Sequence, residues 1–456
     1  MTIYKMKNKP FATALVVVRR TALLLIMLWS AAANSLLFTL HSSHVRAQSA
    51  LEMIKLNRNF AASNYSVYPD SAFTPLTPAP AGKKPFYISH YGRHGSRYVN
   101  QRKVYDTPYN MLKKADSLQL LTPTGRMVLN ELHDIIDDSE GRWGDLTGRG
   151  KQQLRNITRR MMENFPEVFS GDTYIDARST TVARCMISMG AATQHMAYAN
   201  SELQISIRAS KRDMWYMNHQ DTLLRKNGMS SLAKEAYEAF WAKHDKNPRL
   251  MKLLFTNPDS ALTFVNERWF NYYLIKTGLI LKNTHMAHKT SIINLFTDED
   301  VYDLWQIENA HWYILHGASL LNGAKQPYSQ RYLLRQLIAD ADSCIRQERP
   351  NVQLRFGHET VLLPLVCLIG VNGFDLQTES LEELEEKGWM ASLVFPMASN
   401  LQFVFYRSDL NDEDIVFKVL LNEREATLPI PTDMAPYYHW RDFRTFYLNK
   451  LDSYQP

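Results

Sequence analysis

The short, apolar, β-favouring runs of this chain lie towards its two ends, with a long stretch of helical patterns between them. Early runs cover residues 86–89 and 173–176. Late runs cover residues 352–356, 392–395, 401–406 and 415–421. Short apolar runs bounded by turn residues are typical of buried strands. Their distribution predicts an α/β fold with a mixed central sheet flanked by helices and an inserted, mostly helical domain.

A chain of 456 residues can hold one large domain or two to three ordinary ones. We expect the α/β core to be formed by residues 48–200 and 346–456, and the helical insertion by residues 201–345. Apolar periodicity predicts core helices at residues 109–118, 125–136, 150–165, 182–198 and 359–369.

Residues 1–47 differ in composition from the rest of the chain. They contain six basic residues and no acidic residue, so they account for the whole formal net charge of +6. The remainder is neutral, which gives no electrostatic indication of nucleic-acid binding. A basic start, an apolar run from Thr21 to Leu40, and small residues at Val45 and Ala47 predict an export signal cleaved before Gln48. An uncleaved N-terminal anchor also fits, and either interpretation predicts an exported protein, periplasmic or secreted.

The three cysteines, Cys185, Cys344 and Cys367, are odd in number and form no CxxC pair. This pattern argues against a disulfide framework and against a zinc ribbon. Buried free thiols are the expected state in a chain of this size.

The segment Tyr-Ile-Ser-His-Tyr-Gly-Arg-His-Gly-Ser-Arg-Tyr at residues 87–98 carries the densest set of chemical groups. Two histidines four residues apart could bind zinc from one helix face. However, the glycines within the segment and the preceding strand favour a loop. There His94 lies between Arg93 and Arg97, whose guanidinium groups match phosphate oxygens, and Gly95 would let the backbone approach a bound group. A neutral imidazole among them could attack phosphorus, although a plain turn with solvated arginines also fits.

Arg-His-Gly-Ser-Arg at residues 93–97 resembles the RHGxR motif of the histidine phosphatase superfamily, in the branch of histidine acid phosphatases and phytases. The resemblance implies that His94 is the phosphorylated nucleophile and that Arg93 and Arg97 bind the phosphate. For His90 we expect a role in shaping the loop and no chemical role.

Two later segments extend the resemblance. Residues 179–185 resemble the segment that carries a third phosphate-binding arginine, which implies this role for Arg184 and leaves Arg178 as an alternative. The Arg-Cys pair is most similar to the multiple inositol polyphosphate phosphatases. Phe-Gly-His-Glu-Thr at residues 356–360 resembles the distal motif, which reads Gly-His-Ala-Glu-Thr in that group and His-Asp in most acid phosphatases. The resemblance implies that His358 binds phosphate and that Glu359 is the proton donor, as a carboxylic acid beside a leaving alkoxide can be.

Supporting similarity spans residues 146–150, 294–300 and 395–406. The resemblance implies an exported phosphatase of inositol polyphosphates, including phytate, that needs no metal and no organic cofactor. Its partner would be a small polyphosphorylated molecule, with no nucleic acid and no membrane contact beyond an N-terminal anchor. Such a substrate needs additional cations, for which Lys211 and Arg212 are candidates. A broad-specificity acid or sugar phosphatase and a non-catalytic binder of phosphate ligands remain as alternatives.

Overall fold

The computed structural model describes residues 48–69, 74–218, 221, 224, 228–245, 247–347, 349 and 351–455. Residues 49–456 form one compact unit. The predicted signal or anchor at residues 1–47 lies outside the described residues. Within the described residues, no helix has both the length and the apolar character that crossing a membrane requires.

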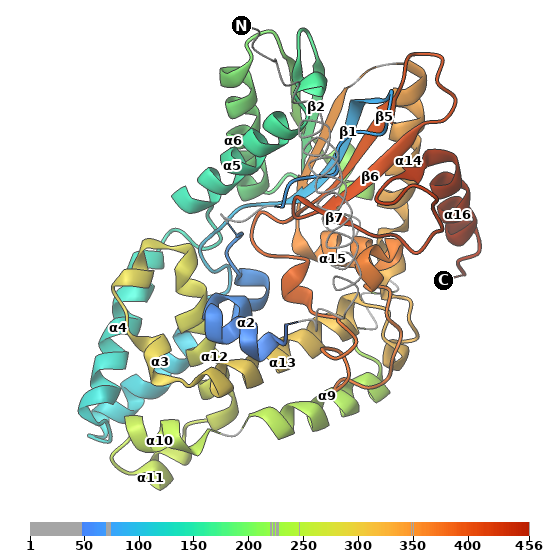
Figure 1. Cartoon of the computed structure of the whole chain (residues 1–456). Helices are drawn as coiled ribbons and strands as arrows, with labels where there is room; N and C mark the ends of the chain where they lie inside the picture. The colour runs from blue at the N-terminus through green and yellow to red at the C-terminus, as the bar shows by residue number, and fades with distance from the viewer. Residues whose placement is uncertain are drawn as a thin grey trace, which may run out of the picture. The chain divides into compact units, whose positions relative to one another are not determined.

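An eight-stranded sheet forms the centre of this unit (Figure 1). Its strands are β1 (Lys84–Arg93), β2 (Tyr174–Ser179), β3 (Gln204–Ala209), β4 (Val352–Gly357), β5 (Asn400–Arg407), β6 (Val416–Leu421), β7 (Arg424–Ala426) and β8 (Tyr438–His439). The order is β3-β2-β4-β1-β5-β6-β7, with β8 beside β6. Pairs on the β3 side of β1 are parallel, and those from β1 to β7 are antiparallel. The predicted mixed α/β fold is therefore confirmed.

Helices cover both faces of the sheet, as Figure 1 shows. On one face lie α5 (Gly148–Asn164) and α6 (Ala183–Ala199), and on the other α14 (Arg331–Gln347), α15 (Glu359–Ile369) and α16 (Trp440–Asp452). Side chains alternate between the faces of a strand. In β1, Ile88 accordingly packs in the apolar cluster on the α5 side, and Tyr87 and Tyr91 pack in the cluster on the α15 side.

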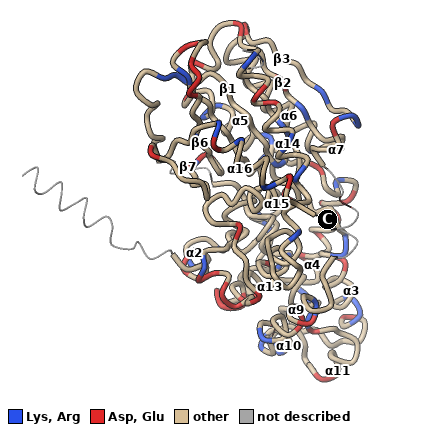
Figure 2. The backbone as a smooth tube through the Cα atoms, turned by 90° about the vertical axis from the view of Figure 1, so that its right-hand side faces the viewer, with Lys and Arg blue, Asp and Glu red and all other residues tan. Residues whose placement is uncertain are grey.

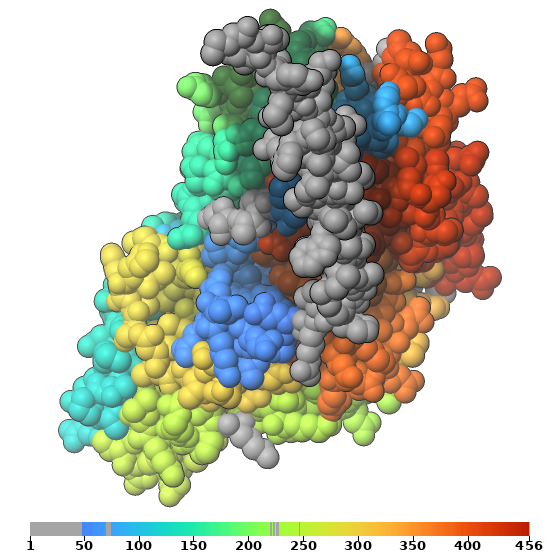
Figure 3. All heavy atoms as spheres, in the orientation of Figure 1, coloured from blue at the N-terminus to red at the C-terminus, as the bar shows by residue number. Residues whose placement is uncertain are grey.

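A second group of helices packs around its own apolar cluster. It comprises α2 (Ala50–Leu56), α3 (Lys103–Ser117), α4 (Pro123–Ser139), α10 (Pro248–Leu254), α12 (Glu267–Ile280) and α13 (Asp298–His316), with α9 (Ser231–His244) and α11 (Pro258–Leu262) nearby. Figure 3 shows the residues of α2 in blue against the yellow segment that contains α12 and α13. Shorter helical segments are η1 (Arg58–Tyr65), η2 (Pro166–Phe169), η3 (Lys211–Asp213), α7 (Met214–Met217), η4 (Leu281–Asn283), η5 (His285–His288), η6 (Ile292–Leu295), η7 (Leu320–Asn322), η8 (Gln326–Gln330), η9 (Val371–Gly373) and η10 (Ala391–Leu393).

The boundaries predicted for the helical insertion, residues 201–345, need correction. Strand β3 lies inside that range but pairs with β2 in the sheet. Most of helix α14 also lies in that range, but this helix packs on the sheet. Conversely, α3 and α4 were predicted to be core helices but pack in the same apolar cluster as α10, α12 and α13. The division into a core and an insertion itself stays a prediction.

One predicted strand, at residues 392–395, is wrong. These residues form the helical turn η10 and the residues that follow it. The carbonyl oxygens of Leu393 and Val394 accept hydrogen bonds from the Asn422 side chain, at 2.9 and 3.1 Å. Side-chain donors thus satisfy backbone groups that a strand would pair with a neighbour.

Charged residues of both signs are interspersed along the described chain (Figure 2). This mixture agrees with the neutral balance of the sequence after residue 47. No single sign of charge dominates the fold, so charge that matters for ligand binding must be concentrated locally.

Candidate active site

Three sequence segments meet at the carboxyl ends of parallel strands. Arg93 at the end of β1 is in register with Gly357 at the end of β4, and the His94 backbone N–H donates to the Gly357 carbonyl at 3.1 Å. At the end of β2, the Thr180 N–H donates to the Phe356 carbonyl at 3.0 Å. Crevices at this edge of α/β sheets are where ligands generally bind. The topology therefore brings together residues that are far apart in the sequence.

The His94 imidazole is fully buried and its hydrogen bonding defines its tautomer. Nδ1 lies 2.9 Å from the carbonyl oxygen of Gly95, which can only accept, so Nδ1 carries the hydrogen. Nε2 is left with a lone pair and has no hydrogen-bond partner among the described residues. Burial, together with the charges of Arg93 and Arg97, holds the pKa of His94 well below its ordinary value. His94 is therefore a neutral imidazole with a free nucleophilic nitrogen.

Three guanidinium groups, those of Arg93, Arg97 and Arg184, lie close enough to His94 for their charges to lower its pKa. Arg93 is fully buried, and its Nη1 donates to the Phe395 carbonyl at 2.6 Å. Burial lowers the pKa of Arg93 to about 10, so it is charged at neutral pH. Arg184, the second residue of α6, is half-buried. Within the described structure, Nη2 of Arg93, Nε of Arg97 and Nε of Arg184 are buried without a hydrogen-bond partner. Buried guanidinium N–H groups that lack partners beside one imidazole can bind an oxyanion.

Glu359, the first residue of α15, faces His94 and Arg93. Its Oε2 lies 3.8 Å from His94 Nε2 and 3.0 Å from Arg93 Nε, while Oε1 accepts a hydrogen bond from Asn64 Nδ2 at 3.0 Å. Burial favours the protonated acid, but the charges of Arg93 and Arg97 outweigh it and hold the pKa of Glu359 well below its ordinary value. The carboxyl group is therefore ionised when no anion is bound beside it.

His358 precedes Glu359 at the N-cap position of α15. Its Nε2 lies 3.3 Å from Thr180 Oγ1, and its ring meets the His94 ring edge-on, with centroids 5.8 Å apart. Burial is the main cause that lowers the pKa of His358 to about 4. A neutral His358 can therefore donate a hydrogen bond to a bound oxyanion.

His94, His358 and Glu359 also offer three ligand atoms within 4.8 Å of one another, a spacing that a metal ion could use. The nearby guanidinium groups of Arg93, Arg97 and Arg184 would repel a cation at this position. The same charges attract an anion, so the donor set fits an oxyanion better than a metal ion.

A model of the histidine phosphatase superfamily (branch 2) matches residues 92–422. The chain belongs to this branch. Both the predicted family and the prediction of a histidine-type phosphatase are thereby confirmed.

Individual relatives and solved structures agree with the branch 2 assignment. Multiple inositol polyphosphate phosphatase 1 of Homo sapiens is 24% identical over 68% of this chain and 67% of its own length. That of Gallus gallus is 22% identical over 84% and 87%. The crystal structure of Bifidobacterium longum multiple inositol polyphosphate phosphatase in complex with inositol hexasulfate superposes with a TM-score of 0.71. It is 16% identical and covers 85% of this chain and 97% of that one, which shows a shared fold.

In this branch 2 phosphatase two glycines from separate motifs are in contact. A Cβ on Gly95 would lie 2.4 Å from the Gly150 carbonyl oxygen, and one on Gly150 would lie 2.3 Å from the Ser96 carbonyl oxygen. Thr147 fixes this junction, because its Oγ1 donates to the Ser96 carbonyl at 3.0 Å and accepts from the Gly150 N–H at 3.2 Å. We expected Gly95 to allow a ligand to approach the backbone. Instead, it lets the start of α5 pack against the catalytic loop.

Gly95→Ala and Gly150→Ala should each destabilise the fold by about 3 kcal/mol, since neither methyl group has space and the obstructing atoms are backbone. Equilibrium unfolding in urea measures the change. Gly148→Ala is the matched control. Gly148 lies in the same helix as Gly150, but a Cβ at Gly148 would have no neighbour within 4 Å. Equal stabilities for the Gly148→Ala and Gly150→Ala proteins would contradict this account.

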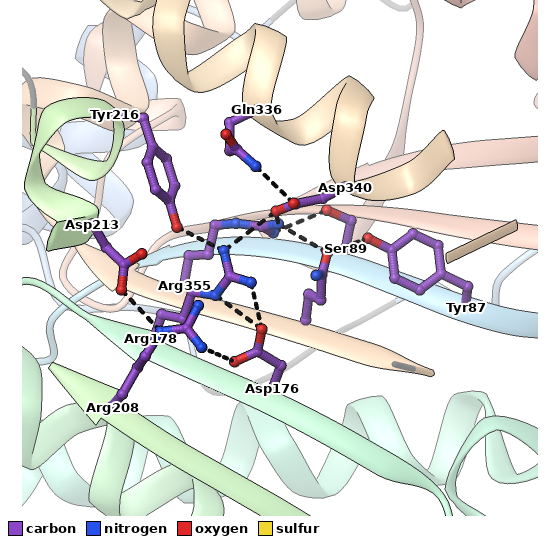
Figure 4. A network of polar contacts seen from close by, with 11 residues as sticks. Tyr87, Ser89, Asp176, Arg178, Arg208, Asp213, Tyr216, Gln336, Asp340 and Arg355 are labelled. Carbon is purple, nitrogen blue, oxygen red and sulfur yellow. Dashed lines mark hydrogen bonds and ion pairs between the residues drawn. The ribbon is translucent and has the colours of Figure 1, made fainter. Parts of the chain in front are cut away.

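Arg178, the alternative phosphate-binding residue, is engaged elsewhere (Figure 4). Its guanidinium donates to Asp176 at 2.5 Å and to the Tyr216 hydroxyl at 2.8 Å, and pairs with Asp340 at 3.5 Å. Arg355 forms an ion pair with the same carboxylate, that of Asp340, at 2.5 Å. The network joins β2, β4 and α14 on one face of the sheet, so Arg178 contributes to packing rather than to the anion site.

A pocket of about 760 Å³ opens above Arg97 and Glu359. Its wall includes four basic side chains from four helices, which are Lys103, Lys234, Lys276 and His311. Sequence reasoning missed these residues. The sequence of α13 contained an indication of this pocket, because Glu308 and His311, three residues apart, interrupt the otherwise apolar face of the helix. Lys211 and Arg212, the predicted substrate contacts, are exposed in η3 and do not line this pocket.

Proposed function

We propose that this chain is an exported phosphomonoesterase that hydrolyses inositol polyphosphates, phytate included, through a phosphohistidine intermediate. One observation carries the proposal: a buried, neutral His94 directs a free Nε2 at an anion site lined by unsatisfied guanidinium N–H groups. The names of the relatives and the inositol hexasulfate bound to the B. longum enzyme support the substrate class.

In the first step, Arg93, Arg97, Arg184 and His358 bind the phosphoryl oxygens and offset their charge. Nε2 of His94 attacks phosphorus as the bond to the ester oxygen breaks, and Glu359 gives its proton to that oxygen. A bound phosphate dianion adds negative charge beside Glu359, which raises the pKa of this carboxyl group. Substrate binding thus favours the protonated acid that the step needs.

In the second step, the Glu359 carboxylate takes a proton from water, and the water oxygen attacks phosphorus. The bond between phosphorus and Nε2 breaks, which releases inorganic phosphate and restores neutral His94. Both steps use the same two side chains, and each half-reaction leaves Glu359 in the protonation state that the other requires.

The pocket wall supports a substrate with several phosphates. A volume of about 760 Å³ lies within the range of small-molecule sites, and Lys103, Lys234 and Lys276 line it beyond the anion site. Lys276 also donates to Glu308 at 2.7 Å, so an added phosphate would compete with this carboxylate for the ammonium group.

Export is supported by the sequence of residues 1–47, with its basic start, apolar run and small residues at Val45 and Ala47. We propose that the mature enzyme acts in the periplasm or outside the cell. Fractionation of cells that express the full chain tests this. Activity confined to the cytoplasm would contradict it.

Release of inorganic phosphate from phytate and from a simple aryl phosphate tests the activity and the substrate class together. We expect the purified protein to hydrolyse both. Hydrolysis of aryl phosphate alone would indicate a broad-specificity acid or sugar phosphatase. Binding of phytate without hydrolysis would indicate a non-catalytic binding protein.

A further inference from the structure

The family match begins at residue 92, but the segment η1 (Arg58–Tyr65), which precedes it, reaches the catalytic centre. Asn64 and Tyr65 both line the pocket. Asn64 Nδ2 donates to Glu359 Oε1 at 3.0 Å. The Tyr65 hydroxyl accepts from Arg97 Nη1 at 2.9 Å, and its ring lies 4.8 Å from the Arg97 guanidinium carbon. Two groups assigned to the chemistry are thus held from outside the matched region.

The backbone that presents Asn64 is strained and firmly held. Ser63 is buried with φ 54° and ψ −124°, a conformation that non-glycine residues rarely adopt. The segment around it is fixed by the Asn59 side chain, which accepts from the Val67 N–H at 2.7 Å, and by Asn283 Nδ2, which donates to the Tyr65 carbonyl at 2.7 Å. The Met397 N–H donates to the Ser66 carbonyl at 2.7 Å. These contacts maintain a strained turn that directs Asn64 at Glu359.

The two oxygens of Glu359 have different surroundings. Oε2 faces Arg93 and His94, and Oε1 faces the Asn64 amide. An amide N–H can donate to a carboxylate and, more weakly, to the carbonyl oxygen of a protonated acid. Oε1 therefore remains an acceptor in both states, which places the acidic proton on Oε2, the oxygen nearest the reacting centre.

We propose that Asn64 is a positioning residue that fixes Oε1 of Glu359 so that Oε2 delivers the proton to the leaving group. The inference rests on the proposed function, because Asn64 acts through Glu359. Proton donation matters most when the leaving group is a strongly basic alkoxide, and least when it is a stable phenolate that can leave without a proton. The decrease in kcat caused by replacing Asn64 should therefore depend on the leaving group.

The test compares an alkyl phosphate with a nitrophenyl phosphate in the Asn64→Leu variant, which keeps similar volume without the donor. We expect kcat for the alkyl phosphate to fall about 10-fold, and kcat for the aryl phosphate and both KM values to change less than about 2-fold. Asn64→Ala provides a second variant if Asn64→Leu does not fold, as judged by thermal unfolding.

Asn200→Ala is the matched control, because it removes side-chain hydrogen bonds with the backbone of Phe169 and Glu202 at the end of α6 that lies away from Arg184. It should lower the unfolding temperature and leave the alkyl to aryl ratio of kcat unchanged. Equal losses on both substrates in Asn64→Leu, or no loss on either, would overturn the positioning role. A wild-type protein that hydrolyses neither substrate would instead overturn the proposed function, so the two failures are distinguishable.

Discussion

Replacing His94 with alanine is expected to lower the turnover of phosphate monoesters by roughly 10⁴-fold or more, as for other essential nucleophiles. The variant keeps the guanidinium groups that bind phosphate but has no group to form the covalent intermediate. The variant should therefore still bind phosphate although it has lost its turnover. Release of inorganic phosphate at saturating substrate measures the loss, and titration with inorganic phosphate measures the binding that remains.

His90→Gln is the matched control for this experiment. His90 is buried four residues earlier in β1, packs against Phe356, and is kept neutral because burial lowers its pKa to about 3. The His90 ring also occupies the space in which a Gly92 side chain would lie, as expected for a residue that shapes the loop. His90→Gln should retain turnover within about threefold, since it removes no reacting group. Substantial turnover in His94→Ala, or no acid-labile phosphoryl adduct in the wild-type protein, would refute the covalent mechanism.

Glu359→Gln is expected to lower kcat for alkyl phosphates by about 10²- to 10³-fold, because glutamine cannot supply the proton that the leaving alkoxide requires. Aryl phosphates, which leave without protonation, should lose much less in the first step. The ratio of kcat/KM values for the two leaving groups is the measurement, because kcat/KM reports the first step alone, whereas kcat also contains the second step, in which Glu359 acts as a base. Equal losses on both would show that Glu359 binds substrate rather than donating a proton.

The pH dependence of Glu359→Gln gives a second measurement of the same role. The pKa of Glu359 lies well below its ordinary value, so the carboxyl group of the wild-type enzyme must gain a proton before the first step. His94 stays unprotonated because its pKa is also well below its ordinary value. Wild-type turnover of alkyl phosphates should therefore rise as the pH falls from neutral. This rise should be absent in Glu359→Gln and present in Glu423→Gln, which alters a buried glutamate paired with Arg160.

The sequence was most informative where a motif follows a strand. Arg93, His94, Arg184, His358 and Glu359 each lie at or just beyond the carboxyl end of a strand, or in the first turn of the helix after it. Because β2, β4 and β1 are parallel neighbours in the structure, those ends meet, and these five residues come together. The order of the strands was not predicted from the sequence. The roles of these residues remain proposals, but their proximity follows from strand order.

The pocket wall could not be predicted in the same way. Asn64 lies in an irregular helical turn with no motif, and its role depends on the strained turn at Ser63. Lys103, Lys234 and Lys276 come from three helices whose packing is decided by apolar contacts. Lys211 and Arg212 are an adjacent basic pair, yet adjacency in sequence does not place a side chain in a pocket. Strand β3 was missed although Ile205 and Ile207 alternate with polar residues, since an edge strand buries little apolar surface.

The position of β1 has a consequence for how the chain folds. The strand that presents His94 pairs on one side with β4 and on the other with β5, and both come from residues beyond 351. During synthesis, β1 therefore has neither of its native neighbours until most of the polypeptide has been made. Contacts over such long sequence separations slow folding, and they leave an apolar strand unpaired in the meantime. Recovery of catalytic activity should consequently be one of the last events in refolding, after the locally connected helices have formed.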